Sequence, residues 1–122
     1  MDQMACSVGG CISLDFERPQ DPRVERIPIR FSSFGHALCI IATGGSHADL
    51  TEEYAAVPAE MKAVAAMFGK EALRAVSLKD VMAQAKEIRR VCGDRAWLRA
   101  VHFFTENERV KRKYKRSGRA IL

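Results

Sequence analysis

The spacing of hydrophobic positions changes along this chain from a strand-like to a helix-like pattern. In the first third, short runs rich in β-branched and apolar residues are separated by turn formers, which predicts strands over about 11–16, 24–31 and 37–42. Residues 19–22 carry two prolines and form the connecting turn. Pro28 removes a ladder donor, so the second strand is expected to be an edge strand or irregular.

The third run is the most apolar segment of the sequence. Residues 37–42 contain no polar side chain apart from the Cys39 thiol, and glycines bound the run at positions 35 and 44. Such a run is typical of a strand that is buried on both faces. We therefore expect residues 37–42 to form the central strand.

Beyond residue 45 the apolar positions recur every three or four residues, which predicts helices. In the first helix Thr51 can cap the initial turn, Pro58 starts or kinks the main part, and Gly69 ends it. Its apolar stripe comprises Tyr54, Val57, Met61, Val64, Ala65 and Phe68.

Two further helices are predicted downstream. Ser77, with Asp80 three residues on, forms an imperfect capping box for a helix that ends near Gly93. Asp94 then caps a third helix that runs towards a basic tail. In this helix we expect one apolar face made by Trp97, Val101 and Phe104, with Leu98 beside them.

The order of elements, strands first and three helices afterwards, predicts an α+β fold rather than a regularly alternating α/β sheet. The 122 residues are 48% hydrophobic and 29% charged, which is ordinary globular composition. The apolar run 37–42 is far shorter than the roughly 20 residues of a membrane span. We expect no membrane partner and no export signal, but composition and periodicity indicate no reaction.

The net charge of +5 has a local source. Seven of the 20 basic residues lie between Arg109 and Arg119 with no acidic residue among them, and the rest of the chain carries 13 basic against 15 acidic residues. A solvated or disordered tail explains such a run better than a phosphate-binding face, so no nucleic-acid partner is expected.

The cysteines and histidines do not suggest a metal site. Four cysteines lack the paired spacing of zinc ligands and are interpreted as reduced thiols. His36, His47 and His102 do not cluster in the sequence, so no metal ligands are assigned.

Four stretches, in the same order and spacing, resemble galactokinases of the GHMP kinase superfamily. The resemblance covers residues 1 to about 110. The stretches are Met1-Asp-Gln-Met-Ala-Cys-Ser-Val-Gly-Gly10, Ala37-Leu-Cys-Ile-Ile-Ala-Thr-Gly-Gly-Ser-His-Ala-Asp-Leu50, Thr51-Glu-Glu-Tyr-Ala-Ala-Val-Pro58 and Gly93-Asp-Arg-Ala-Trp-Leu-Arg-Ala-Val-His-Phe-Phe-Thr-Glu-Asn-Glu-Arg-Val110.

This resemblance implies a partial GHMP-kinase-like fold and transfer of the γ-phosphoryl group of ATP, with Mg²⁺, to the anomeric hydroxyl of galactose. It puts the family's catalytic aspartate at Asp2, where a carboxylate can accept or orient the hydroxyl proton. It puts a sugar-contacting tyrosine at Tyr54, whose ring and hydroxyl suit a sugar. Residues that would bind the nucleotide stay unassigned.

Simpler interpretations stand beside these roles. Apart from the resemblance, Asp2 is a helix cap or a solvated acid, and Tyr54 is one member of an apolar stripe. The glycines of 43–46 could approach a phosphate closely, but the stretch lacks a P-loop lysine, so we interpret it as a turn.

The resemblance also implies a division of the chain. It predicts the end of a catalytic N-terminal lobe over 1–35, the start of a C-terminal lobe over 36–110 and a basic tail over 111–122. The family's sugar-binding segment and ATP loop are not found in this sequence, so we expect a cytoplasmic galactokinase fragment that is inactive alone and self-associates through uncovered surface. The alternative is a non-catalytic, kinase-derived binding or regulatory protein.

Overall fold

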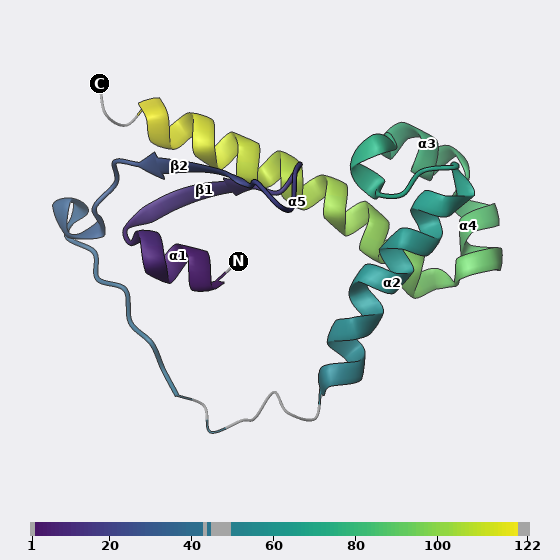
Figure 1. Cartoon of the computed structure of the whole chain (residues 1–122), viewed down its shortest axis with the longest axis horizontal. Helices are drawn as coiled ribbons and strands as arrows, with labels where there is room; N and C mark the ends of the chain where they lie inside the picture. The colour runs from purple at the N-terminus through teal and green to yellow at the C-terminus, as the bar shows by residue number, and fades with distance from the viewer. Residues whose placement is uncertain (1, 43, 45–49, 120–122) are drawn as a thin grey trace. The chain divides into compact units, whose positions relative to one another are not determined.

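A computed structural model describes residues 2–42, 44 and 50–119, with side chains described as far as residue 116. These residues form a mixed α+β structure with five α-helices and one two-stranded antiparallel sheet (Figure 1). None of the described helices has the length and apolar character to cross a membrane. The chain divides into two compact units, Met1–Ala42 with Val110–Leu122, and Thr43–Arg109.

The first unit is built around a β-hairpin preceded by a short helix (Figure 1). Helix α1 spans Asp2–Val8, strand β1 spans Cys11–Asp15 and strand β2 spans Arg23–Ile27. Gly9 and Gly10 join α1 to β1, and both have a φ of +72°, a conformation that glycine adopts without the steric cost of a Cβ atom.

The hairpin confirms the first predicted strand to within one residue and shortens the second. Cys11 pairs with Ile27 and Asp15 with Arg23 at the two ends of the ladder. Strand β2 ends before Pro28, which has no N–H to donate, and a 3₁₀ turn, η1, follows over Phe31–Phe34. The observed strand therefore ends about four residues before the predicted end at residue 31.

The prediction of a central strand over 37–42 is wrong. These residues adopt no regular secondary structure, and Leu38, Ile40 and Ile41 are 82%, 93% and 83% exposed. A strand exists only through hydrogen bonds to a neighbour, and the only sheet among the described residues contains β1 and β2 alone. The apolar pattern was strand-like, but the described chain provides no strand to pair with it.

The second unit begins with a long helix. Helix α2 spans Thr51–Met67, contains Pro58 and has Leu50 rather than Thr51 at its N-cap position. Gly69, with a φ of +66°, follows its end as predicted, and its N–H donates to the Ala66 carbonyl at 2.9 Å.

The predicted helix after Ser77 is interrupted. Helix α3 spans Leu78–Ala83 and helix α4 spans Ala85–Cys92, with Gln84 between them. The capping prediction is confirmed, because the Asp80 N–H donates to the Ser77 Oγ at 3.1 Å. A short 3₁₀ turn, η3, precedes them over Leu73–Ala75.

The last helix, α5, spans Asp94–Arg119 and is longer than the sequence pattern suggested. The basic segment is helical rather than disordered, and its described side chains from Lys111 to Arg116 are exposed. Trp97, Val101 and Phe104 are partly buried as expected, but Leu98 is exposed, and the fully buried residues of α5 are Ala96 and Ala100.

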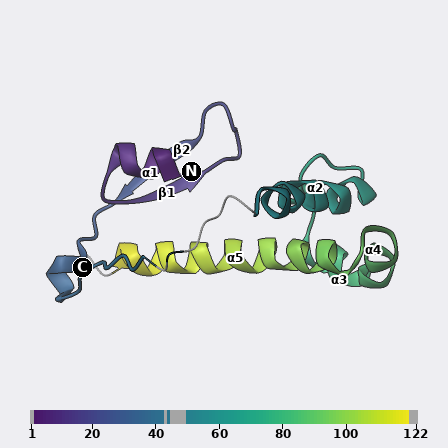
Figure 2. The same ribbon diagram turned by 90° about the horizontal axis from the view of Figure 1, so that it is seen from below.

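In the second unit, helices α2, α3 and α4 gather beside the first part of α5 (Figure 2), and the hydrophobic core of the described residues belongs entirely to this unit. Its fully or almost fully buried side chains come from α2, η3, α3, α4 and the first part of α5, with partly buried aromatic and thioether groups around them. The buried residues are Val64, Ala65, Leu73, Val81, Ile88, Ala96 and Ala100.

Candidate functional site

Asp2, the candidate catalytic residue, is the first residue of α1 and is exposed. An acidic side chain in the first turn complements the positive end of the helix dipole, so the observed position suits the capping role. The same exposure leaves the carboxylate accessible to a ligand. Both interpretations of Asp2 are therefore compatible with its surroundings.

Helix α1 is attached to the hairpin at its other end. The Arg26 Nη2 on β2 donates to the Val8 carbonyl at 3.1 Å, which places a cation at the C-terminal end of the helix. Within the helix, the Ser7 Oγ donates to the Gln3 carbonyl at 2.8 Å. The short helix that carries Asp2 is thus held against the sheet by a charge-assisted contact.

Tyr54, the candidate sugar contact, lies in the first turns of α2 and is 60% exposed. It does not belong to the core, although the apolar stripe of the sequence included it. Asp2 belongs to the first unit and Tyr54 to the second, so the structure describes each residue in its own surroundings.

A cluster of ion pairs beside Tyr54 joins α2 to α5. Arg99 lies 2.9 Å from Glu60, and Arg95 contacts Glu60 at 2.6 Å and Glu53 at 3.2 Å. The side chains of Arg99 and Glu60 are 20% and 19% exposed, so this pair is shielded more than an ordinary surface pair. The hydrogen bond from Arg95 to Glu60 raises the pKa of the Arg95 guanidinium.

This cluster was not found from the sequence. Its acids are seven residues apart on α2 and its arginines four apart on α5, and each pair alone resembles ordinary surface charge. Only the packing of the two helices brings them together, and the arrangement balances two positive with two negative charges. We assign it a structural role.

Trp97, near the start of α5, has a buried indole N–H without a hydrogen-bond acceptor among the described residues. The Arg89 guanidinium lies 5.7 Å from the centre of the indole ring, a cation–π arrangement, and donates to Asp94 at 2.7 Å. That hydrogen bond lowers the pKa of Asp94.

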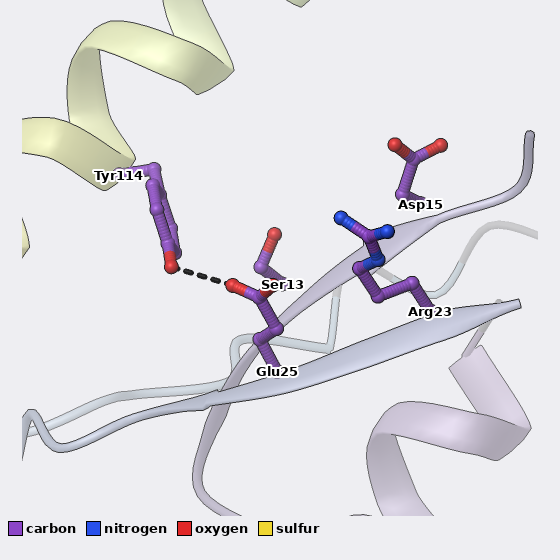
Figure 3. A pocket seen from close by; sticks show the side chains of 5 residues that line it. All are labelled: Ser13, Asp15, Arg23, Glu25 and Tyr114. Carbon is purple, nitrogen blue, oxygen red and sulfur yellow. Dashed lines mark hydrogen bonds between the residues drawn. The ribbon is translucent and has the colours of Figure 1, made fainter.

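The first unit has a shallow hollow on one face of the hairpin (Figure 3). It has a volume of about 160 Å³ and is lined by Ser13 and Asp15 of β1, Arg23 and Glu25 of β2, and Tyr114 of α5. The Tyr114 hydroxyl donates to Glu25 at 2.5 Å, and this hydrogen bond raises the pKa of the tyrosine. A small polar group could lie here, but the lining offers no activated nucleophile.

The remaining candidate positions form no site that can be described. Of residues 43–46 only Gly44 is described, so the predicted turn lies largely outside the described residues, as does His47. Among residues 2–42, 44 and 50–119 no three histidine, cysteine or acidic side chains gather as metal ligands do. The thiols of Cys6, Cys11, Cys39 and Cys92 are all free.

Phosphoryl transfer makes demands on the surroundings of a carboxylate such as Asp2. That reaction requires groups that hold the nucleotide phosphates and neutralise their charge. Asp2 is the only charged residue of α1, so this helix contributes one carboxylate and no cation. The described residues do not assemble a site for ATP and Mg²⁺, and we derive no step through them.

Comparison with known proteins adds no relative, since no family model, curated protein or solved structure matches this chain.

Proposed function

We propose that this chain is a galactokinase-related segment with a partial GHMP-kinase-like fold, in which Asp2 acts on the anomeric hydroxyl of galactose. The observation that supports the proposal is the exposed Asp2 carboxylate at the start of α1, within the Met-Asp-Gln motif. The proposal depends on the sequence resemblance, and the exposure of Asp2 leaves the carboxylate free to meet a substrate.

In the proposed reaction the Asp2 carboxylate would orient or accept the proton of the sugar hydroxyl, and the phosphoryl donor, ATP with Mg²⁺, is implied by the resemblance alone. Tyr54 contacts the sugar through its exposed ring and its hydroxyl. ATP and the metal would be bound mainly by groups other than the described residues. The 122 residues alone are therefore proposed to bind sugar weakly and to lack turnover.

The proposal includes the organisation and location that the resemblance implies. Residues 1–35 would end a catalytic N-terminal lobe, residues 36–110 would start a C-terminal lobe, and 111–122 would form a basic tail. The protein would be cytoplasmic, with galactose and ATP as ligands and no nucleic-acid or membrane partner.

A second candidate function is a non-catalytic, kinase-derived binding or regulatory protein. The exposure of Leu38, Ile40 and Ile41 favours it, because a contiguous apolar surface is characteristic of interaction sites. This function would leave Asp2 and Tyr54 without a sugar ligand.

The binding half of the proposal is tested by NMR titration of the chain with galactose, and with glucose as the epimeric control. We expect galactose to shift the amide signals around Asp2 and Tyr54, and Tyr54→Ala to remove that response. Tyr114→Ala is the matched control, since Tyr114 is also partly exposed but lies on the hairpin hollow. Identical responses to both sugars, or none to either, would contradict sugar recognition.

The catalytic half is tested in a chimera that carries residues 1–110 in place of the corresponding segment of a galactokinase. Asp2→Asn should lower turnover by about 10²–10⁴-fold with little change in sugar affinity, because it removes charge and proton acceptance at nearly constant shape. Asp21→Asn, an exposed aspartate of the hairpin turn, is the control. Undiminished turnover of the Asp2→Asn chimera would remove Asp2 from the mechanism.

The isolated chain should show no ATP-dependent phosphorylation of galactose in a coupled assay with Mg²⁺. Saturable turnover that Asp2→Asn abolishes would show that these residues hold ATP after all.

A further inference from the structure

Residues 37–42 are apolar in sequence but exposed in the structure. Their sequence, Ala-Leu-Cys-Ile-Ile-Ala, has the apolar character of a strand covered on both faces, yet Leu38, Ile40 and Ile41 are almost fully exposed. Within the described residues, no backbone hydrogen bond engages this segment. Both its side chains and its backbone groups are therefore available to another strand.

The composition of the segment suits intermolecular strand pairing. The six residues are all apolar apart from the Cys39 thiol, include the strand formers Ile40 and Ile41, and contain no charge, proline or glycine, which are features of segments that pair between chains. Unpaired strand-like segments in native proteins usually carry a charge or a proline that prevents such pairing, and residues 37–42 carry neither.

The segment is also suited to pairing with itself. Along an antiparallel ladder, hydrogen-bonded pairs alternate with non-hydrogen-bonded pairs. A two-fold axis perpendicular to the sheet cannot exchange these two kinds of pair, so it must pass between a residue and the same residue of the other copy. Cys39 is one of the two central residues of the apolar run 37–42, and an axis beside it keeps residues 37–41 in the ladder. With Cys39 facing Cys39, Leu38 faces Ile40 and Ala37 faces Ile41, so every pair within 37–41 is apolar or a thiol pair and none brings like charges together.

We propose that residues 37–42 are a self-recognition strand, through which two copies of this chain associate antiparallel with Cys39 opposite Cys39. This interaction is independent of the proposed sugar chemistry, since neither Asp2 nor Tyr54 belongs to it. A two-stranded ribbon is only marginally stable and keeps two open edges. Association is therefore concentration-dependent and proceeds to larger species at high concentration.

The first experiment measures molar mass by light scattering after size-exclusion chromatography over a wide range of concentration, in reducing buffer. We expect a shift from monomer to dimer and larger species. Ile40→Lys should weaken dimerisation by at least about tenfold, because it replaces both apolar contacts between Ile40 and Leu38 of the other copy with a charged side chain. Leu98→Lys, an exposed leucine of α5, is the matched control and should leave association unchanged.

A folding control accompanies these variants. The circular dichroism and the urea midpoint of the helical unit should be the same for Ile40→Lys and the unsubstituted chain, because Ile40 lies outside its core. A chain that stays monomeric at every concentration overturns the proposal. So does association that Ile40→Lys and Leu98→Lys weaken equally.

The second experiment tests the register by oxidative cross-linking. In a chain where Cys6, Cys11 and Cys92 are replaced by serine, copper–phenanthroline and air should oxidise Cys39 to an intermolecular disulfide, because Cα atoms opposite each other in an antiparallel pair lie within disulfide range. Moving the single cysteine to position 38 or 40 should slow dimer formation. Faster cross-linking from position 38 or 40 than from Cys39 would overturn the proposed register.

Discussion

The two units of this chain differ in how their side chains are buried. Residues 43–109 enclose seven buried hydrophobic side chains, whereas no described side chain of residues 2–42 or 110–116 is fully buried. The helical unit therefore has a core of its own. The hairpin unit relies on its ladder and on exposed polar contacts, which contribute much less to the free energy of folding.

The difference originates in the sequence of strand β2. Arg23, Glu25 and Arg26 place charges on both faces of the strand, so neither face can pack against an apolar layer. An isolated two-stranded sheet is at best marginally stable in water. Regular hydrogen bonding in the hairpin therefore does not by itself make an independent folding unit.

Hydrogen exchange gives the most direct test of this comparison and the largest expected effect. The amides of α4 and of the first part of α5 should exchange at least about 100-fold more slowly than those of β1 and β2, because opening the former exposes the core. The intact chain is pulse-labelled with deuterium and then digested with pepsin, and the masses of the peptides measure this difference. Equal protection in both units would show that the hairpin is stabilised by burial after all.

Removing core volume should destabilise only the helical unit. Ile88→Ala should lower its free energy of unfolding by about 2–4 kcal/mol, because Ile88 is fully buried and the cavity cannot collapse completely. Val91→Ala, at an exposed position of the same helix, is the control and should cost less than about 1 kcal/mol. Urea unfolding followed by circular dichroism at 222 nm measures both. Similar losses would contradict the observed core.

The ion-pair cluster between α2 and α5 should have a smaller effect. Glu60→Gln should cost about 1–2 kcal/mol, because it leaves the shielded Arg99 with only the more distant Glu53, at 4.0 Å, as a counter-charge. Glu53→Gln should change stability by less than about 0.5 kcal/mol, since that carboxylate is largely solvated. Urea midpoints compare the two variants, and an equal effect would mean that burial does not distinguish the pairs.

The smallest expected effect is the loss of stability in acid that comes from the contact between Arg89 and Asp94. Because Arg89 lowers the pKa of Asp94, this contact stabilises the folded state above the ordinary aspartate pKa of 3.8 and is lost as the pH falls through the lower folded-state value. The stability difference between the unsubstituted chain and Asp94→Asn should therefore be constant near neutral pH and shrink in acid. Asp21→Asn, in the hairpin unit, serves as the control. A difference that grows in acid would reverse the sign of this argument.

Local patterns predicted the elements that depend on local interactions. The turn formers before β2, the helical spacing of α2 and the Ser77 cap all act within a few residues, and each was found where the sequence indicated. The break at Gln84 was not predicted, because Val81 and Ile88 on its two sides are both buried and the apolar period continues across it.

Features that depend on distant partners could not be predicted. The run 37–42 has the pattern of a buried strand, but burial requires a neighbour that no local pattern reveals. Ala96 and Ala100 carry little hydrophobic signal, yet both are fully buried in the core of the helical unit. At the candidate site, the sequence singled out Asp2 and Tyr54, and the structure adds only that both are accessible within their own units.

The division of the chain has a consequence for the order in which it folds during synthesis. The hairpin unit contains residues from two distant parts of the sequence, and the contact between Glu25 and Tyr114 spans 89 positions. The ribosome synthesises the whole helical segment 43–109 after the hairpin and before Tyr114. The hairpin unit therefore waits for its last contact until residues 43–109 have been synthesised, and during that interval the apolar residues 37–42 can meet neighbouring nascent chains.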